Sequence, residues 1–367
     1  MARKLKSDKP LFLTTILLVA VSVVMVYSAS APLALEKYGQ GSTFLVKQSL
    51  WAVLGLAILA VVMRIDYRAY REPVFIWTCL GVVGVALVLV LFSPAVNNAH
   101  RWFGLGFLGV QPSELAKLAA IFFIAALLER RMHRIDDLKY ALLPIGLVVA
   151  ALVGLILLEP DFGTSMSLLI IAAVMVFSAG VSYRYVAGAV LCAVPAVYLL
   201  VMGTAYRRRR MLAFLHPWDD PLNTGFQVIQ SLIAVATGGV WGKGLMNGVQ
   251  KLFYLPEPHT DFIFSVISEE LGLIGATVVL ICFCVVAWRG VNVALRAPDT
   301  FGSFLALGLT TMVVVQAFIN ISVVLGLMPT KGIPLPFVSS GGSSLLINLV
   351  GMGILLNVSQ HVTSTEA

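Results

Sequence analysis

Residues 254–288 read YLPEPHTDFIFSVISEELGLIGATVVLICFCVVAW, a proline-rich polar segment followed at once by an apolar run. The run over 262–287 exceeds the roughly 20 helical residues that cross a hydrocarbon core of about 30 Å. The stretch predicts a membrane-spanning helix whose entrance carries Glu257, His259 and Asp261. Ionisable side chains at such a position are expensive unless they have a function or a partner, so they mark a candidate functional site.

The rest of the chain repeats this apolar pattern. Of its 367 residues, 59% are hydrophobic and only 12% are charged, whereas a soluble domain has about 25% charged residues. Lipid offers the backbone no hydrogen-bond partners, and barrel strands would alternate over segments of about ten residues. The sequence therefore predicts an all-α integral membrane protein of about ten transmembrane helices, at 11–31, 44–63, 74–92, 112–128, 140–158, 162–180, 185–202, 262–287, 301–327 and 341–358.

The basic residues predict the orientation of these spans. Positive charge concentrates in cytoplasmic segments, and an N-terminus inside leaves most lysines and arginines there, at Arg3, Lys4, Lys6, Lys9, Arg64, Arg68, Arg71, Arg130, Arg131, Arg134, Lys139, Arg184, Arg289 and Arg296. The first run is longer than the apolar region of a signal peptide, so it is interpreted as a retained span. We therefore expect a single membrane domain over 11–360 between cytoplasmic tails 1–10 and 361–367, with an extracytoplasmic loop 203–261 between the seventh and eighth spans.

The long loop contains a basic cluster that breaks this charge rule. Arg207, Arg208, Arg209, Arg210, Lys243 and Lys251 all lie in it, which favours an anionic ligand or lipid headgroups over a topological role. The net charge of +7 comes without any recognisable nucleic-acid module, so no nucleic-acid partner is expected. The four cysteines, Cys79, Cys192, Cys282 and Cys284, fall inside apolar runs and are interpreted as small core residues rather than disulfides or metal ligands.

Four polar segments are predicted to open on the same face of the membrane. They are 93–117, 158–165, 225–261 and 328–344. Their convergence predicts one extracytoplasmic site. Within the third segment, the apolar stretch around 226–241 is too short to span and predicts a helix that lies at the interface or re-enters it.

Asp261 has two interpretations. It can cap the following helix, since aspartate is a good N-cap, or it can be a functional acid. Ser265, Ser268 and Gly272 fall within about 40° of Asp261 on an ideal helix, so this small, polar stripe should face something other than lipid. Capping does not account for Glu257 and His259, which two flanking prolines hold in a stiff segment.

The other candidate residues also have structural alternatives. Glu114 and Lys117, near His100 and Arg101, form either a structural ion pair or a wall of the same cavity. Asp161 is either a helix cap or a cavity acid.

Two further groups lie at helix starts or inside a span. Lys331 and the run at 339–344, SSGGSS, offer a cation and backbone N–H groups suited to phosphate, or a turn of small residues. Glu269 and Glu270, inside the eighth span, must be functional or strongly paired.

Five stretches, occurring in order, resemble the SEDS family (shape, elongation, division and sporulation). They are VNNAHRW, QPSELAKL, EPDFGTS, QKLFYLPEPHTDFIFSVISEELG and PTKGIPLPFVSSGGSSLL. The similarity covers about 11–360 and is greater to the division type than to the elongation type. Where the family usually has tyrosine before the last GGSS, this chain has Ser340.

The resemblance implies a ten-helix fold and a peptidoglycan glycosyltransferase of the bacterial cytoplasmic membrane. Such an enzyme polymerises lipid II at the outer face for cell division or cell shape, with a class B penicillin-binding protein and other membrane proteins of the division or elongation complex as partners. It also implies that the family's essential acid is Asp261.

These features together give a hypothesis for the site. Asp261 takes the proton of the attacking sugar hydroxyl, and Glu257 and His259 shape its surroundings or help to hold a divalent cation, Mg²⁺ or Mn²⁺, with no organic cofactor. A lipid II flippase or membrane carrier is the alternative function, and a scaffold that only recruits a transpeptidase is a third. The candidate substrate-binding residues are His100, Arg101, Glu114, Lys117, Asp161, Arg207, Arg208, Arg209, Arg210, Lys251, Glu257, His259, Lys331, Ser339, Ser340, Gly341 and Gly342.

Overall fold

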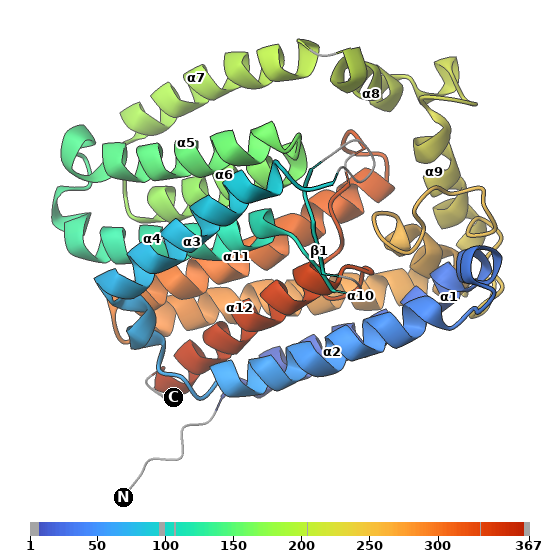
Figure 1. Ribbon diagram of the computed structural model, residues 1–367, viewed down its shortest axis with the longest axis horizontal. Coiled ribbons are helices and arrows are strands. Elements are labelled where there is room, and N and C mark those ends of the chain that lie inside the picture. Colours follow the sequence, from blue (N-terminus) through green and yellow to red (C-terminus); the bar gives the residue numbers. More distant parts are fainter. Residues whose placement is uncertain (1–6, 95–99, 106–107, 204, 331, 363–367) are drawn as a thin grey trace, which may run out of the picture.

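The structure, a computed structural model, describes residues 7–94, 100–105, 108–203, 205–330 and 332–362. Within these ranges each of the ten predicted apolar runs coincides with one long helix, so the predicted all-α membrane fold is confirmed (Figure 1). The long helices are α1 (Lys9–Tyr38), α2 (Thr43–Val62), α3 (Pro73–Val90), α4 (Pro112–Arg131), α5 (Leu143–Leu158), α6 (Phe162–Ser178), α7 (Tyr183–Met202), α10 (Ile263–Arg296), α11 (Thr300–Val324) and α12 (Gly342–His361).

Short elements connect the long helices. Strands β1 (Phe103–Leu105) and β2 (Leu108–Val110) form an antiparallel pair that the sequence analysis did not predict. The predicted short helix of the long loop is α9 (Phe226–Gly238), which packs on α10. The remaining short helices are α8 (Ala205–Leu215), the 3₁₀ turns η1 (Tyr67–Arg71), η2 (Met132–Arg134) and η4 (Pro217–Asp219), and the π-helical turn η3 (Leu138–Leu142).

Among the helices of the described ranges, seven are long and apolar enough to cross a membrane by length and composition alone: α1, α2, α3, the continuous η3 and α5, α10, α11 and α12. α6 is shorter, with 17 residues. α4 is long enough but mostly buried by its neighbours, and it carries both Glu114 and Lys117. A helix surrounded by protein does not need an apolar surface toward lipid, which explains why α4 can carry charges.

The core of the bundle is built around α4, α11 and α12. α11 packs against α4, α6 and α10, while α12 packs against α2 and α11. Figure 1 shows α7 at the margin of the bundle, and the start of α1 at the same end of the molecule as the end of α12.

The small, polar stripe of α10 faces protein, as predicted. Ser265 Oγ lies 2.8 Å from Ser231 Oγ of α9. At Gly272, α10 is kinked with φ of 66°, a conformation that favours glycine. A Cβ atom at this position would also collide with the backbone of Gly242.

The cysteine interpretation needs one correction. Cys282 is buried and Cys79 is half-buried, but Cys192 and Cys284 are exposed on the sides of their helices. The core interpretation was therefore wrong for these last two, because a membrane helix exposes apolar residues to lipid as readily as it buries them.

Candidate active site

Asp261 lies just before α10 and does not cap it. The helix begins at Ile263 with Phe262 as its N-cap and has no side-chain cap hydrogen bond, so the capping interpretation was wrong. The carboxylate is half-buried, and Gly332 lies so close that a Cβ atom there would be 2.9 Å from Asp261 Oδ2. Among the described residues, none donates a hydrogen bond to this carboxylate. It is therefore available to a ligand.

Burial is the main reason why the pKa of Asp261 rises to about 7. The negative charge of Glu257 raises this pKa further, and Asp161 adds a smaller contribution in the same direction. The positive charges of Arg210 and Arg101 lower it. A carboxyl group with a pKa near 7 suits general acid–base chemistry at neutral pH.

Two side chains fix the backbone around Asp261. Asn320 Nδ2 in α11 donates to the carbonyl of Asp261 at 2.8 Å and to that of Ile333 at 2.7 Å. Ser339 Oγ donates to the carbonyl of Thr260 at 2.6 Å. These bonds hold the segment before α10 against the segment between α11 and α12, and they hold Asp261 beside Gly332.

Glu257 and His259 occupy different environments. Glu257 is exposed with φ of 50°, whereas His259 is buried and its ring lies 4.8 Å from that of Phe44. Burial lowers the pKa of His259, and the neighbouring charge of Glu257 opposes this shift. Burial therefore favours the neutral imidazole of His259, and its buried Nδ1 atom has no partner among the described residues.

Two of the predicted cations, Arg101 and Arg210, lower the pKa of Asp261. Arg101 donates to the carbonyls of Glu159 at 3.0 Å and Pro160 at 2.5 Å, and Arg210 donates to that of Thr330 at 3.2 Å. Arg208 and Arg209 are exposed on α8. The side chain of Arg207 and the whole of Lys331 lie outside the described residues.

A second acidic group lies at the start of α6. Asp161 caps this helix through the N–H group of Thr164 at 3.1 Å, and Gln111 Nε2 donates to its carboxylate at 2.9 Å. The capping interpretation of Asp161 is thus confirmed, and the acid is also buried. Next to it, Glu159 is fully buried with no partner for either carboxylate oxygen in the described chain. Burial, together with the charge of Asp161, raises the pKa of Glu159 to about 8.

Glu114 and Lys117 form a buried ion pair of 2.9 Å, as the structural alternative predicted. Lys117 Nζ also donates to Gln316 Oε1 at 3.0 Å, and Gln316 Nε2 donates to the carbonyl of Pro334 at 3.2 Å. The pair therefore connects α4 and α11 to the segment that carries Gly332. It thereby stabilises the segment that lies beside Asp261.

Lys251 belongs to a separate buried cluster. Its ammonium lies 2.6 Å from Glu270 Oε1 and 2.9 Å from Ser28 Oγ. Glu269 is paired with Lys243 at 2.7 Å and accepts from backbone N–H groups of the same loop. Both glutamates are thus strongly paired, and they fasten the loop to α10.

The remaining predicted site residues are placed by their backbones or lie at the surface. The N–H group of Ser340 donates to the carbonyl of His259 at 2.9 Å, which places Ser340 beside the site. Gly341 is the N-cap of α12, and a Cβ atom at Gly342 would collide with the Trp51 ring. His100 is exposed, with Nδ1 against the carbonyl of Ser93.

A metal site built from protein ligands alone is not present in the described ranges. No three His, Cys, Asp or Glu side chains come close enough together there. Asp261 nevertheless fits a Mg²⁺ ion held by one carboxylate and by substrate phosphates, because Mg²⁺ is commonly bound in that way.

Sequence reasoning missed Asn320, Gln316 and Glu159. The first two are polar residues inside the apolar α11, and polar groups within a span are a recognisable signal of this kind. Glu159 stood inside a quoted motif, but its burial without a partner is visible only in three dimensions.

The fold and the site define an integral membrane protein with an acid and two arginines gathered at one end of a helical bundle. Residues 8–364 match the family of FtsW, RodA and SpoVE cell cycle proteins, and the chain belongs to this family.

Known proteins similar over nearly full length agree with this assignment. The chain is 45% identical over 365 residues to the probable peptidoglycan glycosyltransferase FtsW of Geobacter metallireducens, covering 98% of this chain and 96% of that protein. It is 41% identical to the stage V sporulation protein E of Bacillus subtilis, again over 365 residues and 98% of this chain.

Solved structures show the same fold. A chain from the study "Structural coordination of polymerization and crosslinking by a peptidoglycan synthase complex" aligns with a TM-score of 0.79 at 30% identity, covering 97% of this chain and 98% of that one. The rod shape determining protein RodA of Thermus thermophilus aligns with a TM-score of 0.72 at 29% identity, covering 97% of each chain.

Proposed function

We propose that this chain is a peptidoglycan glycosyltransferase that polymerises lipid II into glycan strands for cell division. The observation that carries the proposal is the Asp261 carboxylate, which accepts no hydrogen bond from the described residues and is under the influence of Arg101 and Arg210. Relatives named as probable peptidoglycan glycosyltransferases FtsW, at 45% identity over nearly the whole chain, support the same activity.

The residues suit the reaction. The acceptor sugar hydroxyl loses its proton to Asp261, and its oxygen forms a bond to the anomeric carbon of the donor. The bond between that carbon and the diphosphate breaks, and undecaprenyl diphosphate leaves with the bonding electrons. Arg101 and Arg210 stabilise the negative charge that develops on the departing diphosphate.

The pKa of Asp261 results from two opposed effects. Burial keeps the carboxyl group basic enough to accept a proton, whereas Arg101 and Arg210 favour its charged form. A divalent cation, Mg²⁺ or Mn²⁺, held by Asp261 and the diphosphate would supply further positive charge to the leaving group. Gly332 leaves space beside the carboxylate, and Asn320 keeps its backbone in place.

The proposed site faces the outside of the bacterial cytoplasmic membrane. Positive charge at the opposite end supports this orientation, since Lys9 begins α1, Arg289 pairs with Asp8 just before it, and Arg64 lines a pocket with His361 at the end of α12. A class B penicillin-binding protein is the proposed partner. The neighbouring structure from a peptidoglycan synthase complex, whose title couples polymerisation with crosslinking, supports this choice.

The buried acids give less support to a flippase or carrier. A proton or ion relay needs acids that can exchange partners along a path. Glu114, Glu269 and Glu270 are instead held in ion pairs of 2.6–2.9 Å with lysines. These glutamates therefore suit the framework of an enzyme better than the path of a carrier.

The proposal is tested with purified protein, its transpeptidase partner and labelled lipid II. Asp261→Asn should abolish glycan product while leaving the thermal unfolding curve and partner binding unchanged. Asp219→Asn, which alters an exposed acid of the same loop, is the matched control and should retain activity. Wild-type activity in Asp261→Asn, or lipid translocation in liposomes without polymer, would contradict the proposal.

A further inference from the structure

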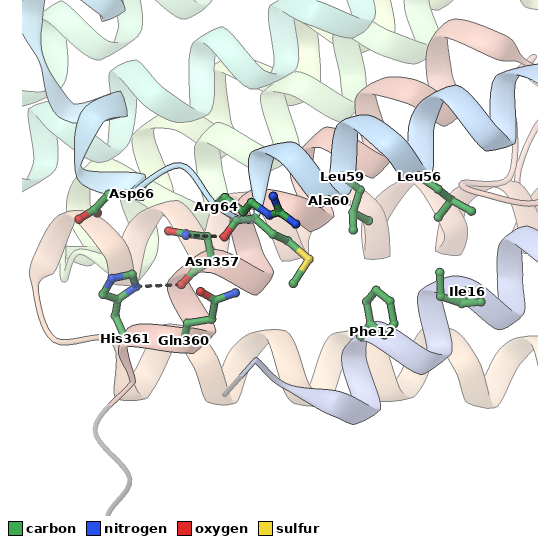
Figure 2. Close-up of a pocket in the computed structure, with 11 residues that line it drawn as sticks. Phe12, Ile16, Leu56, Leu59, Ala60, Arg64, Asp66, Asn357, Gln360 and His361 are labelled. Atoms are coloured by element: carbon green, nitrogen blue, oxygen red, sulfur yellow. Dashed lines mark hydrogen bonds between the residues drawn. The ribbon is translucent and has the colours of Figure 1, made fainter. Parts of the chain in front are cut away.

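A pocket lies where the start of α1 approaches the end of α12, at the end of the bundle away from Asp261. Its volume is about 670 Å³, within the range of about 300–1,000 Å³ typical of small-molecule sites. It is formed by α1, α2 and the end of α12 (Figure 2).

The pocket has an apolar part within the helical span and a polar part at the helix ends. Phe12 and Ile16 of α1 face Leu56 and Leu59 of α2 in Figure 2. Arg64, which follows α2, lies with Asp66, Gln360 and His361 at the polar end. This division into an apolar groove and a charged rim matches an amphiphile that lies parallel to the helices.

The charge at the rim favours an anion. Arg64 is exposed, and within the described ranges no carboxylate lies within ion-pair distance of it. The only carboxylate that lines the pocket in the described chain, Asp66, accepts from the N–H group of Arg68 at 2.9 Å and lies 3.7 Å from its guanidinium. Lys9 is exposed one helical turn before Phe12 and therefore adds a second cation to the same face of α1.

Two polar side chains of α12 that line the pocket, Asn357 and His361, already have hydrogen-bond partners within the protein. Asn357 accepts from the N–H group of Tyr67 at 2.9 Å and donates to the carbonyl of Met63 at 2.9 Å. His361 Nδ1 lies 3.0 Å from the carbonyl of Asn357 (Figure 2). These bonds fix the wall of the pocket, so a ligand meets a formed site and Arg64 is its principal charged contact.

The terminal segments of the chain are poor occupants by composition. Residues 1–6, MARKLK, carry three cations, which Arg64 and Lys9 would repel. Residues 363–367, TSTEA, contain no large apolar side chain for the groove between Phe12 and Leu59. A lipid supplies both an apolar chain and a negative phosphate.

We propose that this pocket binds an anionic phospholipid of the leaflet opposite the Asp261 site, with an acyl chain between α1 and α2 and the headgroup phosphate at Arg64. A basic residue near an anionic membrane surface contributes about 1 kcal/mol. Loss of Arg64 should therefore weaken retention of the anionic lipid about fivefold. The inference does not depend on the activity of the Asp261 site.

The test uses the full chain in nanodiscs of phosphatidylcholine with phosphatidylglycerol added. Native mass spectrometry after release from the nanodiscs measures which lipid stays bound. The wild type should retain phosphatidylglycerol preferentially. Arg64→Gln should lose about fivefold of this preference, and Ala60→Trp, which places a ring in the groove, should lower the retention of both lipids.

Arg184→Gln is the matched control, because Arg184 is an exposed arginine at a helix start outside the pocket. It should behave as the wild type. Equal losses in Arg64→Gln and Arg184→Gln would mean that general surface charge is responsible. That result, or unchanged retention in both Arg64→Gln and Ala60→Trp, would overturn the proposal. Thermal unfolding curves confirm that each variant is folded.

Discussion

Asn320, near the C-terminal end of α11, binds the backbone of Asp261, with Nδ2 2.8 Å from the Asp261 carbonyl oxygen. The same nitrogen donates to the carbonyl of Ile333. One amide group thus joins the segment that carries the candidate base to the segment that carries Gly332. The position of the base relative to Gly332 depends on a residue that lies outside both segments.

Replacing Asn320 with leucine should lower both stability and activity. The change leaves the buried carbonyl of Ile333 without its donor, at a cost of about 1–3 kcal/mol. Thermal unfolding should show this loss, and the rate of glycan synthesis should fall further than the loss of folded protein explains. Asn348→Leu is the control, since the Asn348 amide donates within its own helix, to Ser344. If the two variants lost activity equally, Asn320 would have no particular role in positioning Asp261.

The rate of polymerisation should depend on pH through Asp261. Its pKa is about 7, and only the ionised carboxylate accepts a proton. The rate should therefore fall about tenfold for each pH unit below the pKa and level off above it. Because the folded protein holds this proton more tightly than the unfolded chain does, the same group makes folding less favourable as pH rises from 3.8 through about 7.

Neighbouring charges provide a check on this assignment. Glu257→Gln removes a negative charge that raises the pKa of Asp261, so the profile should move to lower pH. Arg210→Ala removes a cation that lowers this pKa, and the profile should move to higher pH. Single-turnover rates over a pH series measure both shifts. Identical midpoints in all three proteins would rule out Asp261 as the titrating group.

The contribution of Glu114 and Lys117 to the stability of the fold should depend on the presence of both charges. Lys117→Met leaves a carboxylate buried without its cation, which typically costs about 3–5 kcal/mol. The double variant Glu114→Gln, Lys117→Met removes both charges and should recover much of this stability. Thermal unfolding of the two single variants and the double variant gives the coupling. Additive losses would show that the pair is not coupled in the folded protein.

The helices and the position of Asp261 could be predicted from the sequence, because both depend on local patterns. An apolar run of sufficient length specifies a span, and the polar segment before it marks the end of the span at which Asp261 lies. The partners of Asp261 could not be predicted. Asn320 is 59 residues from Asp261 along the chain, and its choice of acceptor follows from helix packing.

The structural role of Lys251 also could not be predicted from the sequence. In the sequence it is one more cation of a basic loop, so it was included among candidates for diphosphate binding. Glu270, its partner, lies 19 residues later and two turns inside the next helix. The kink of α10 at Gly272 and the close approach of Gly242 bring this loop against the helix, and neither feature is apparent in one dimension.

Arg210 and Lys251 should therefore differ in their effects on lipid II binding. Arg210→Ala should raise the dissociation constant at least about tenfold, because a charged contact to phosphate is typically worth about 1.5–3 kcal/mol. Its unfolding temperature should change little. Lys251→Ala should instead lower the unfolding temperature, since it leaves Glu270 buried without its ammonium partner.

Two measurements on each variant separate the roles. Fluorescent lipid II titrations give the dissociation constant, and thermal unfolding gives stability. The double variant Glu270→Gln, Lys251→Met should regain stability and bind lipid II as the wild type does, because both buried charges are absent. Weak lipid II binding by this stable double variant would place Lys251 at the substrate after all. Normal binding by Arg210→Ala would remove that arginine from the site.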